Sequence, residues 1–491
     1  MKMSELFPSS LFNLPAGLTG RGEKYLYQSG IFRTGNTVTL FSLGVELFKN
    51  ITDAVEEYLK SNGFKKIIQK DPSYQDIIKE VTSPKQLPLF FYSFSGGFHF
   101  YLYSIGEKSS KVKDIIDYIL KKYIREMVDV VQESEKISKA VIIPQAPFKF
   151  FTCSFCRYST TADYPLKYLP DNYPGEKGKP VEKVFTPSKK TIKDLCDFLG
   201  IPPEKTIKTL IYKAYTEKEK NYFAVLVPGS RNIDERKLKS VLKGKEVELA
   251  GIEEVERLTG APHGFAGPVD LKGLKIIADI EVAKMRNVVT GANERDYHLI
   301  NVNPGRDFYI DILADVKETQ EGDSCPLCGN KLNIREGIKI AEWEKFCYKN
   351  MEAETGTIYF DNVILALSEQ NCDEKGLKWP STIAPYKIVV IPINVKDEKL
   401  VNYAFSLYTK LNKIIPTVID DRIQSPGVKF KDAELLGFPI FIILGPKSFE
   451  KGTAEIKIRK RDEKLEIDIV KVIEKVCELL NLPTKDCCVE F

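Results

Sequence analysis

Cys153-Ser-Phe-Cys156 and Cys325-Pro-Leu-Cys328 are two Cys-x-x-Cys pairs that bracket a segment of domain size, residues 157–324. Each pair presents two sulfur atoms from one tight turn, and a tetrahedral zinc site needs four ligands. If all four cysteines bind one zinc ion, the two ends of the bracketed segment must meet in space. A chain that leaves one place and returns there contains an inserted domain. The pairs therefore predict a structural zinc site at the base of an insertion, with two unrelated pairs of buried thiols as the alternative.

Length and composition set the broad class of the protein. At 491 residues the chain is too long for one hydrophobic core, so we expect several domains. Its ten cysteines, together with a start that lacks the apolar core of a secretory leader, favour a reducing, cytoplasmic location. The formal net charge of +4 is nearly neutral and does not by itself predict nucleic-acid binding. We expect neither a membrane partner nor DNA binding.

The segment before the first cysteine pair reads as a mixture of helices and strands. Leu87–Gly106 is apolar enough to be mistaken for a membrane span, but Gly96-Gly97 at its centre and its many aromatic residues favour two buried strands joined by a tight turn. Apolar residues recur at helical spacing over residues 44–59 and 115–131, which predicts two amphipathic helices. A short strand is expected at Val141–Ile143.

The bracketed segment has its own start, stop and loop signals. Thr191–Gly200 predicts a helix with a threonine cap and a glycine stop. The loop Gly264-Phe-Ala-Gly267-Pro268 is rich in glycine and can aim backbone N–H groups at an anion or a carbonyl oxygen, although surface turns have the same composition. His298 lies in an alternating segment, where a packed strand residue is the ordinary interpretation. Strand and helix patterns alternate again over residues 388–444 and predict a small mixed sheet.

Several long stretches carry a family resemblance. KQLPLFFY (85–92), VFTPSKKTIKDLCDFLG (184–200), LTGAPHGFAGPV (258–269), GANERDYHLINVNPGRDF (291–308), EGDSCPLCG (321–329) and KWPSTIAPYKIVVIPIN (378–394) resemble the bacterial-type prolyl-tRNA synthetases, a class II family with an inserted editing domain. The resemblance covers nearly the whole chain. It implies an α/β protein of the α+β kind, with a class II synthetase-like antiparallel-sheet core over residues 1–160 and 321–383. A mixed α/β editing domain over 161–320 and an α/β anticodon-binding domain over 384–491 complete the expected organisation.

The resemblance also predicts that the ligase site is damaged. Class II synthetases use ATP and magnesium, and arginines of motifs 2 and 3 hold the phosphates. Here the motif 2 loop is Ser95-Gly-Gly-Phe98, and the motif 3 arginine position is Asn362. The proline-binding Thr-x-Glu of the family corresponds to Ser73-Tyr74-Gln75, in which Gln75 replaces the carboxylate. We therefore expect a disabled ATP site, and the alternative is an active proline-tRNA ligase with a divergent core.

The stretches that resemble the editing domain retain the family's functional positions. In the family this domain hydrolyses alanine wrongly attached to tRNA(Pro), because small apolar side chains differ too little in binding energy for initial selection. The resemblance implies that Lys208 holds the phosphate or ribose of the terminal adenosine; a surface lysine on a helix is the alternative. Gly264, Gly267 and Pro268 would frame a loop whose N–H groups face the ester carbonyl. Asp279 and His298 would shape a pocket sized for a methyl group.

One departure favours a third hypothesis. The family's Gly-Asp-His after the expected strand Tyr222–Val227 is Gly229-Ser230-Arg231 here, which suggests a non-catalytic tRNA-binding or partner protein with an idle pocket.

The C-terminal part carries the expected contacts to tRNA. The resemblance assigns binding of tRNA(Pro) to Asp421, Arg422, Lys429 and Lys431, and the two lysines would point the same way if they lay on a strand. A plain solvated face is the alternative. Class II cores commonly pair, so a homodimer is also expected.

Overall fold

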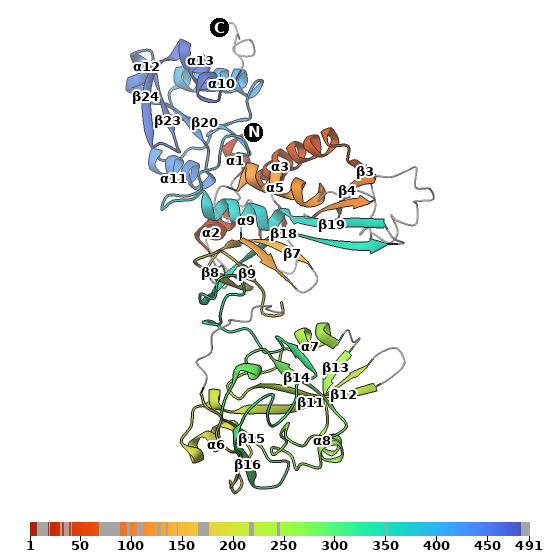
Figure 1. Ribbon diagram of the computed structural model, residues 1–491. Coiled ribbons are helices and arrows are strands. Elements are labelled where there is room, and N and C mark those ends of the chain that lie inside the picture. The colour runs from red at the N-terminus through yellow and green to blue at the C-terminus, as the bar shows by residue number, and fades with distance from the viewer. Residues whose placement is uncertain are drawn as a thin grey trace. The chain divides into compact units, whose positions relative to one another are not determined.

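In the computed structural model, the chain folds into two compact units (Figure 1). Unit 1 contains Met1–Asp129, Ile137–Phe148 and Glu336–Phe491, and unit 2 contains Val130–Lys136 and Lys149–Arg335. The chain thus leaves unit 1 and returns to it after an excursion of domain size. The structure describes residues 1–6, 18, 20–29, 32–33, 39–40, 42–67, 89–95, 99–105, 111–124, 129–133, 136–144, 146–164, 176–215, 220–242, 246–348 and 351–482.

A largely antiparallel sheet forms the centre of unit 1. Among its first six strands, neighbours run antiparallel apart from the parallel pair β3–β4, as predicted for the core. The predicted pair of strands in the apolar stretch is confirmed, since β4 and β5 pair antiparallel from Leu89 to Ile105. The strands follow the order β3 (Lys65–Ile67), β4 (Leu89–Ser95), β5 (His99–Ile105), β19 (Met351–Tyr359), β18 (Leu332–Tyr348) and β7 (Ile137–Ile142).

Amphipathic helices pack against this sheet. The predicted helix over residues 44–59 is confirmed as α3 (Ser42–Ser61), whose Leu47 and Ile51 are fully buried. The prediction of one helix over 115–131 is wrong at its end, because α5 (Lys111–Tyr123) ends before Asp129–Gln132, which forms the strand β6. The β-branched pair Val130-Val131 suits a strand better than a helix. The other elements here are α1 (Met3–Leu6), α2 (Arg21–Gln28), β1 (Phe32–Arg33), β2 (Thr39–Leu40) and α9 (Phe360–Gln370).

The C-terminal part of unit 1 is the predicted small mixed sheet. Its strand order is β21-β20-β22-β23-β24, with parallel pairing among the first three strands and antiparallel pairing after them. Every residue of β20 and β22 is buried, which explains their continuous apolar sequence. The elements are β20 (Ile388–Pro392), α10 (Glu398–Asn412), β21 (Thr417–Ile419), α11 (Pro426–Leu436), β22 (Ile440–Leu444), α12 (Pro446–Glu450), β23 (Thr453–Ile458), β24 (Glu463–Asp468) and α13 (Val472–Leu479).

Unit 2 is built on a mixed sheet in the order β13-β11-β12-β14-β17. A smaller antiparallel sheet has the order β10-β16-β15. The predicted capped helix is confirmed as α6, because the Thr191 side chain accepts from Asp194 N–H and Gly200 ends the helix in the left-handed region. The elements are β8 (Phe148–Cys153), β9 (Ser159–Thr160), β10 (Glu182–Phe185), α6 (Ile192–Leu199), β11 (Ile207–Tyr215), β12 (Lys220–Pro228), α7 (Glu235–Leu242), β13 (Glu246–Leu249), α8 (Ile252–Thr259), β14 (Lys275–Asp279), β15 (Val288–Gly291), β16 (Tyr297–Val302) and β17 (Ile312–Ala314).

The structure also bears on the membrane question. Within the described residues, none of the helices is both long enough and apolar enough to cross a lipid bilayer.

Candidate functional site

A cavity of about 540 Å³ in unit 2 brings together residues that the sequence had singled out. Lys208, Gly264 and His298 all line it. One wall is formed by Ile207–Ile211 of β11, the part of this strand that precedes its pairing with β13, which begins at Tyr212. Thr191, at the start of α6, lines another part of the cavity. A cavity of this size accommodates a small organic ligand.

Lys208 lies on the strand β11 rather than on a helix, and its side chain is held in place. Lys208 Nζ donates to Asn232 Oδ1 at 3.3 Å, and Asn232 Nδ2 in turn donates to Glu318 Oε2 at 3.3 Å. Burial lowers the pKa of Lys208, while the carboxylate of Glu318 opposes that shift. The site therefore contains an oriented, half-buried cation. Asn232 and Glu318 were not predicted from the sequence.

His298 is almost completely buried in the cavity wall, with 4% of its surface exposed. Its Nδ1 lies 2.6 Å from Thr186 Oγ1, and its ring packs against Phe265 with the centroids 5.6 Å apart. Burial lowers the pKa of His298 to about 4. The imidazole is therefore neutral at neutral pH, and it shapes the cavity without adding charge.

Replacing His298 with Gln should flatten the dependence of stability on pH. The pKa of His298 falls from 6.5 to about 4 on folding, so the unfolded chain binds the proton first and stability is lost as pH drops through this window. We expect the unchanged chain to lose about 2 kcal/mol more than the variant between pH 7 and pH 4, after allowing for partial screening by solvent. Urea unfolding at several pH values measures this difference. His263→Gln, at an exposed position of the cavity wall, should keep the pH dependence of the unchanged chain.

The glycine-rich loop contributes less than predicted. Gly267 N–H already donates to Asn293 Oδ1 at 2.7 Å, and Pro268 has no N–H group. Gly267 has instead a packing role, because a Cβ atom there would lie 1.9 Å from the carbonyl oxygen of Gly291. The expectation that Gly267 and Pro268 present N–H groups to a ligand is therefore wrong. Gly264, whose φ is +93°, and Ala266 line the cavity, and each carries a backbone N–H group.

Asp279 is not part of the cavity wall, contrary to the expectation. Its carboxylate is fully buried and accepts from the N–H groups of Glu281 at 2.9 Å, Val316 at 3.0 Å and Lys317 at 3.1 Å. Burial and the neighbouring Asp315 raise the pKa of Asp279 to about 6. A buried carboxylate needs several hydrogen-bond donors, and here backbone N–H groups supply them. Asp279 thus links the end of β14 to residues 316–317.

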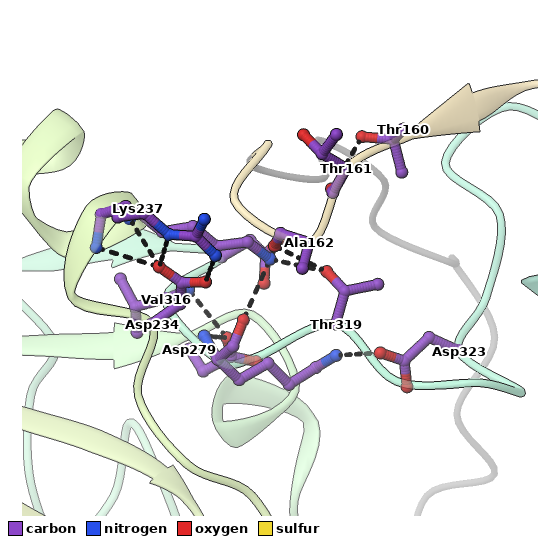
Figure 2. Close-up of polar contacts among 12 residues, drawn as sticks. Thr160, Thr161, Ala162, Asp234, Lys237, Asp279, Val316, Thr319 and Asp323 are labelled. Carbon is purple, nitrogen blue, oxygen red and sulfur yellow. Dashed lines mark hydrogen bonds and ion pairs between the residues drawn. The ribbon is translucent and has the colours of Figure 1, made fainter. Parts of the chain in front are cut away.

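A buried polar network, also unpredicted, surrounds that segment (Figure 2). Lys237 is completely buried and donates to Asp315 Oδ2 at 2.7 Å, to the Lys317 carbonyl at 2.9 Å and to Thr319 Oγ1 at 2.9 Å. Lys317 Nζ pairs with Asp323 Oδ2 at 2.9 Å. The same network holds Arg231, whose guanidinium pairs with Asp323. Arg231 is therefore engaged outside the cavity wall, so its presence at the family's histidine position does not block the cavity.

The two Cys-x-x-Cys pairs meet, as predicted for one metal site. The Sγ atoms of Cys153, Cys156, Cys325 and Cys328 lie within 4.8 Å of one another. Cys153 Sγ is 3.5 Å from Cys328 Sγ, and Cys156 Sγ is 3.5 Å from Cys325 Sγ. Zinc–sulfur bonds of about 2.3 Å give a tetrahedron with edges of about 3.8 Å, so the sulfur set fits a metal such as zinc. The N–H of Leu327 and the amide of Asn330 point at sulfur atoms, as donors around bound thiolates do.

The predicted ligase positions are only partly described. Ser73, Gln75 and the motif 2 loop at 96–98 lie outside the described residues. Asn362 lies in the first turn of α9, and its Nδ2 donates to the carbonyl of Lys339 at 2.7 Å. Its side chain therefore serves an internal contact.

The predicted tRNA contacts in the C-terminal part need correction. Lys429 and Lys431 lie on the helix α11 rather than on a strand, so they do not share a face. Lys429 is completely buried, including its long aliphatic stem. Its Nζ donates to the carbonyls of Pro392 at 2.9 Å and Asp420 at 3.0 Å. It is therefore unavailable to a phosphate, whereas Lys431 is exposed.

The other two predicted tRNA contacts already have partners within the unit. The Arg422 guanidinium pairs with Asp420 and Asp432, each at 2.8 Å. Asp421 accepts from the N–H of Ser4 at 3.1 Å and from its hydroxyl at 2.8 Å.

Comparisons with known proteins match both parts of the chain. A family model described as aminoacyl-tRNA editing domain matches residues 186–308, and one described as anticodon binding domain matches residues 387–479. A proline–tRNA ligase of Thermoanaerobacter sp. (strain X514) is 42% identical over 351 residues, which cover 67% of this chain and 60% of that protein. One from Pelotomaculum thermopropionicum is 41% identical over 345 residues, covering 66% and 60%. The chain thus spans about 60% of the length of these relatives.

A solved structure is similar at lower identity. A prolyl-tRNA synthetase from Cryptosporidium parvum, complexed with L-proline and AMP, is 11% identical with a TM-score of 0.43, over 94% of this chain and 77% of that one.

Proposed function

We propose that this chain, which belongs to the prolyl-tRNA synthetase family, hydrolyses alanyl-tRNA(Pro) in the cavity of unit 2. The observation that carries the proposal is the meeting of Lys208, His298 and the Gly264 loop around one cavity within the residues matched as an editing domain. These groups supply a cation for a phosphate, a neutral wall and backbone donors. In our proposal the C-terminal domain binds the tRNA, and a zinc ion on the four cysteines has a structural role.

The chemistry needs no protein nucleophile, because an aminoacyl ester is already activated. Lys208 pairs with a phosphate or ribose oxygen of the terminal adenosine and fixes the ester in the cavity. A water molecule attacks the ester carbonyl carbon, and the N–H groups of Gly264 and Ala266 stabilise the negative charge on the carbonyl oxygen. The bond between that carbon and the ribose oxygen then breaks. The ribose oxygen takes up the proton that the water releases, leaving alanine and free tRNA.

We further propose that the ligase core is disabled. Asn362 stands where the family places a phosphate-binding arginine, and its amide is bonded to the Lys339 carbonyl. The sequence has no arginine between Arg335 and Arg422 that could replace it. The alternative of an idle editing pocket loses its main support, because Arg231 pairs with Asp323 and is not among the residues of the cavity wall.

Replacing Lys208 with Met should lower the rate of alanyl-tRNA(Pro) hydrolysis about 10- to 150-fold. The variant loses a charge-assisted contact worth about 1.5–3 kcal/mol while keeping the length of the side chain. The measurement is release of labelled alanine from alanyl-tRNA(Pro) by the full chain. Lys213→Met is the matched control, because Lys213 lies on the same strand but pairs with Glu248 at 3.2 Å outside the cavity wall.

The outcomes separate the hypotheses. No hydrolysis by the unchanged chain would overturn the proposal in favour of a non-catalytic tRNA-binding protein. Hydrolysis that Lys208→Met and Lys213→Met lower equally would place the reaction elsewhere.

A further inference from the structure

The lysine that lines the cavity is held by two segments that lie far apart in the sequence. Lys208 Nζ donates to Asn232 Oδ1 at 3.3 Å, and Asn232 Nδ2 donates to Glu318 Oε2 at 3.3 Å. Asn232 belongs to the connection between β12 and α7, whereas Glu318 follows β17 on the way to the second cysteine pair. The direction in which the lysine points therefore depends on how these two segments are aligned with each other.

The two segments run side by side as a short antiparallel pair. Ile233 and Lys317 form an isolated bridge between them. Glu318 N–H donates to the Asn232 carbonyl at 2.9 Å. A two-stranded pairing is only marginally stable by itself, so the alignment of these segments needs support from side chains.

One buried carboxylate joins the two segments through a cation on each. Arg231 pairs with Asp323 Oδ1. Lys317 Nζ pairs with Asp323 Oδ2 at 2.9 Å (Figure 2). Asp323 is 5% exposed, so water screens these charge–charge contacts little. Arg231 directly precedes Asn232, and Lys317 directly precedes Glu318. Asp323 thus holds each segment one residue away from a group that orients the cavity lysine.

From this arrangement we propose that Arg231 is a positioning residue for Lys208. Its ion pair with Asp323 fixes the segment that carries Asn232, and Asn232 in turn holds the Lys208 ammonium in the cavity wall. This inference deepens the proposed function and rests on it for the reaction that Lys208 serves. It gives a role to the arginine that stands at the family's histidine position.

Replacing Arg231 with Met removes one of the contacts of the carboxylate and leaves the others. Asp323 Oδ2 keeps Lys317 and the N–H of Gln320, which donates at 2.8 Å. A buried carboxylate that retains a cation and a backbone donor is compatible with a folded unit. The segment that carries the amide partner of the cavity lysine loses its charged anchor, so that hydrogen bond should weaken.

Amine labelling measures the position of Lys208 without tRNA and without hydrolysis. An ammonium group that donates to an amide oxygen gives up its proton less readily, and only the free amine reacts in reductive methylation. We expect Arg231→Met to raise the rate of Lys208 methylation about 2- to 10-fold, the effect of losing one hydrogen bond. Peptide mass spectrometry of the full chain at one mildly alkaline pH gives the rate. Lys213, on the same strand, should react at an unchanged rate.

Two further variants separate positioning from a general loss of stability. Arg231→Lys keeps a cation for Asp323 and should return the rate of Lys208 methylation close to that of the unchanged chain. Arg306→Met is the matched control, since Arg306 pairs with Asp307 at 2.8 Å in the same unit and is not part of the cavity wall. It should leave the rate of Lys208 methylation unchanged.

A double-mutant cycle tests the same link in the reaction. Arg231→Met should lower hydrolysis of alanyl-tRNA(Pro) by the otherwise unchanged chain about 2- to 10-fold. It should have no further effect in the Lys208→Met background. A residue that acts only through Lys208 loses its effect when that lysine is absent, whereas general destabilisation would lower both backgrounds equally.

The outcomes distinguish this inference from the proposed function. Lys208 methylation that Arg231→Met leaves unchanged, or that Arg306→Met raises equally, would overturn the positioning role even if hydrolysis is found. Equal loss of hydrolysis in both backgrounds of the cycle would overturn it as well. A specific rise in Lys208 methylation supports the positioning role even if no hydrolysis is detected, in which case the proposed function alone fails.

Discussion

The purified chain, supplied with proline, ATP, magnesium and labelled pyrophosphate, is expected to form no labelled ATP above background. Formation of an adenylate requires positive charge on the phosphates as they separate. Asn362 stands at the predicted motif 3 arginine position, and its amide donates to the carbonyl of Lys339 at 2.7 Å. The sequence also has no arginine between Arg33 and Arg125, where motif 2 would lie. Losing one such contact lowers the rate about 10²- to 10³-fold, so two losses give about 10⁴- to 10⁶-fold.

The exchange experiment needs a control for each way in which it can fail. A proline–tRNA ligase from a relative, assayed under the same conditions, shows that the reagents support exchange. Asn362→Arg should not restore exchange, because it supplies one guanidinium group and leaves the motif 2 loop unchanged. Proline-dependent exchange by the unchanged chain would contradict the disabled core and establish the alternative of an active, divergent ligase.

The fold was predictable to the extent that local patterns decide it. The Thr191 cap and the Gly200 stop set the bounds of α6, and Gly96-Gly97 correctly divided an apolar stretch into two strands. These signals are local, since a cap or a turn needs its own residue at its own place. The error at 115–131 has the same origin, because an apolar helix pattern ran on into residues that form β6.

The site was predictable only in part, because its functional groups depend on contacts distant in sequence. Asp279 accepts from residues 316 and 317, and Lys429 donates to Pro392, so neither partner could be inferred from neighbours in the sequence. Thr209 also lines the cavity, and it was not predicted for a different reason. Reasoning about strands assigns consecutive side chains to opposite faces, whereas this cavity is lined by both Lys208 and Thr209.

Replacing Cys325 with Ser is expected to remove a bound zinc ion and to destabilise unit 2. A structural zinc ion contributes its binding free energy directly to folding, about 10–16 kcal/mol in small zinc peptides. A loss of only about 3 kcal/mol in a domain of this size would lower Tm by about 6–12 °C. The measurements are the metal content of the purified chain, expected at about one zinc per chain, and the thermal unfolding of unit 2.

Loss of zinc and of stability should follow only when one of the four clustered cysteines is replaced. Cys347→Ser is the matched control, because Cys347 is an exposed thiol of unit 1 and is not one of the four clustered cysteines. It should keep both the zinc content and Tm of the unchanged chain. Cys325 is fully buried and sits two residues beyond Asp323, which pairs with Lys317 and Arg231. Loss of the metal should therefore loosen residues 317–325, where the chain leaves the inserted domain. A metal-free chain whose Tm responds equally to both substitutions would contradict a structural zinc site and leave the cysteines as two pairs of buried thiols.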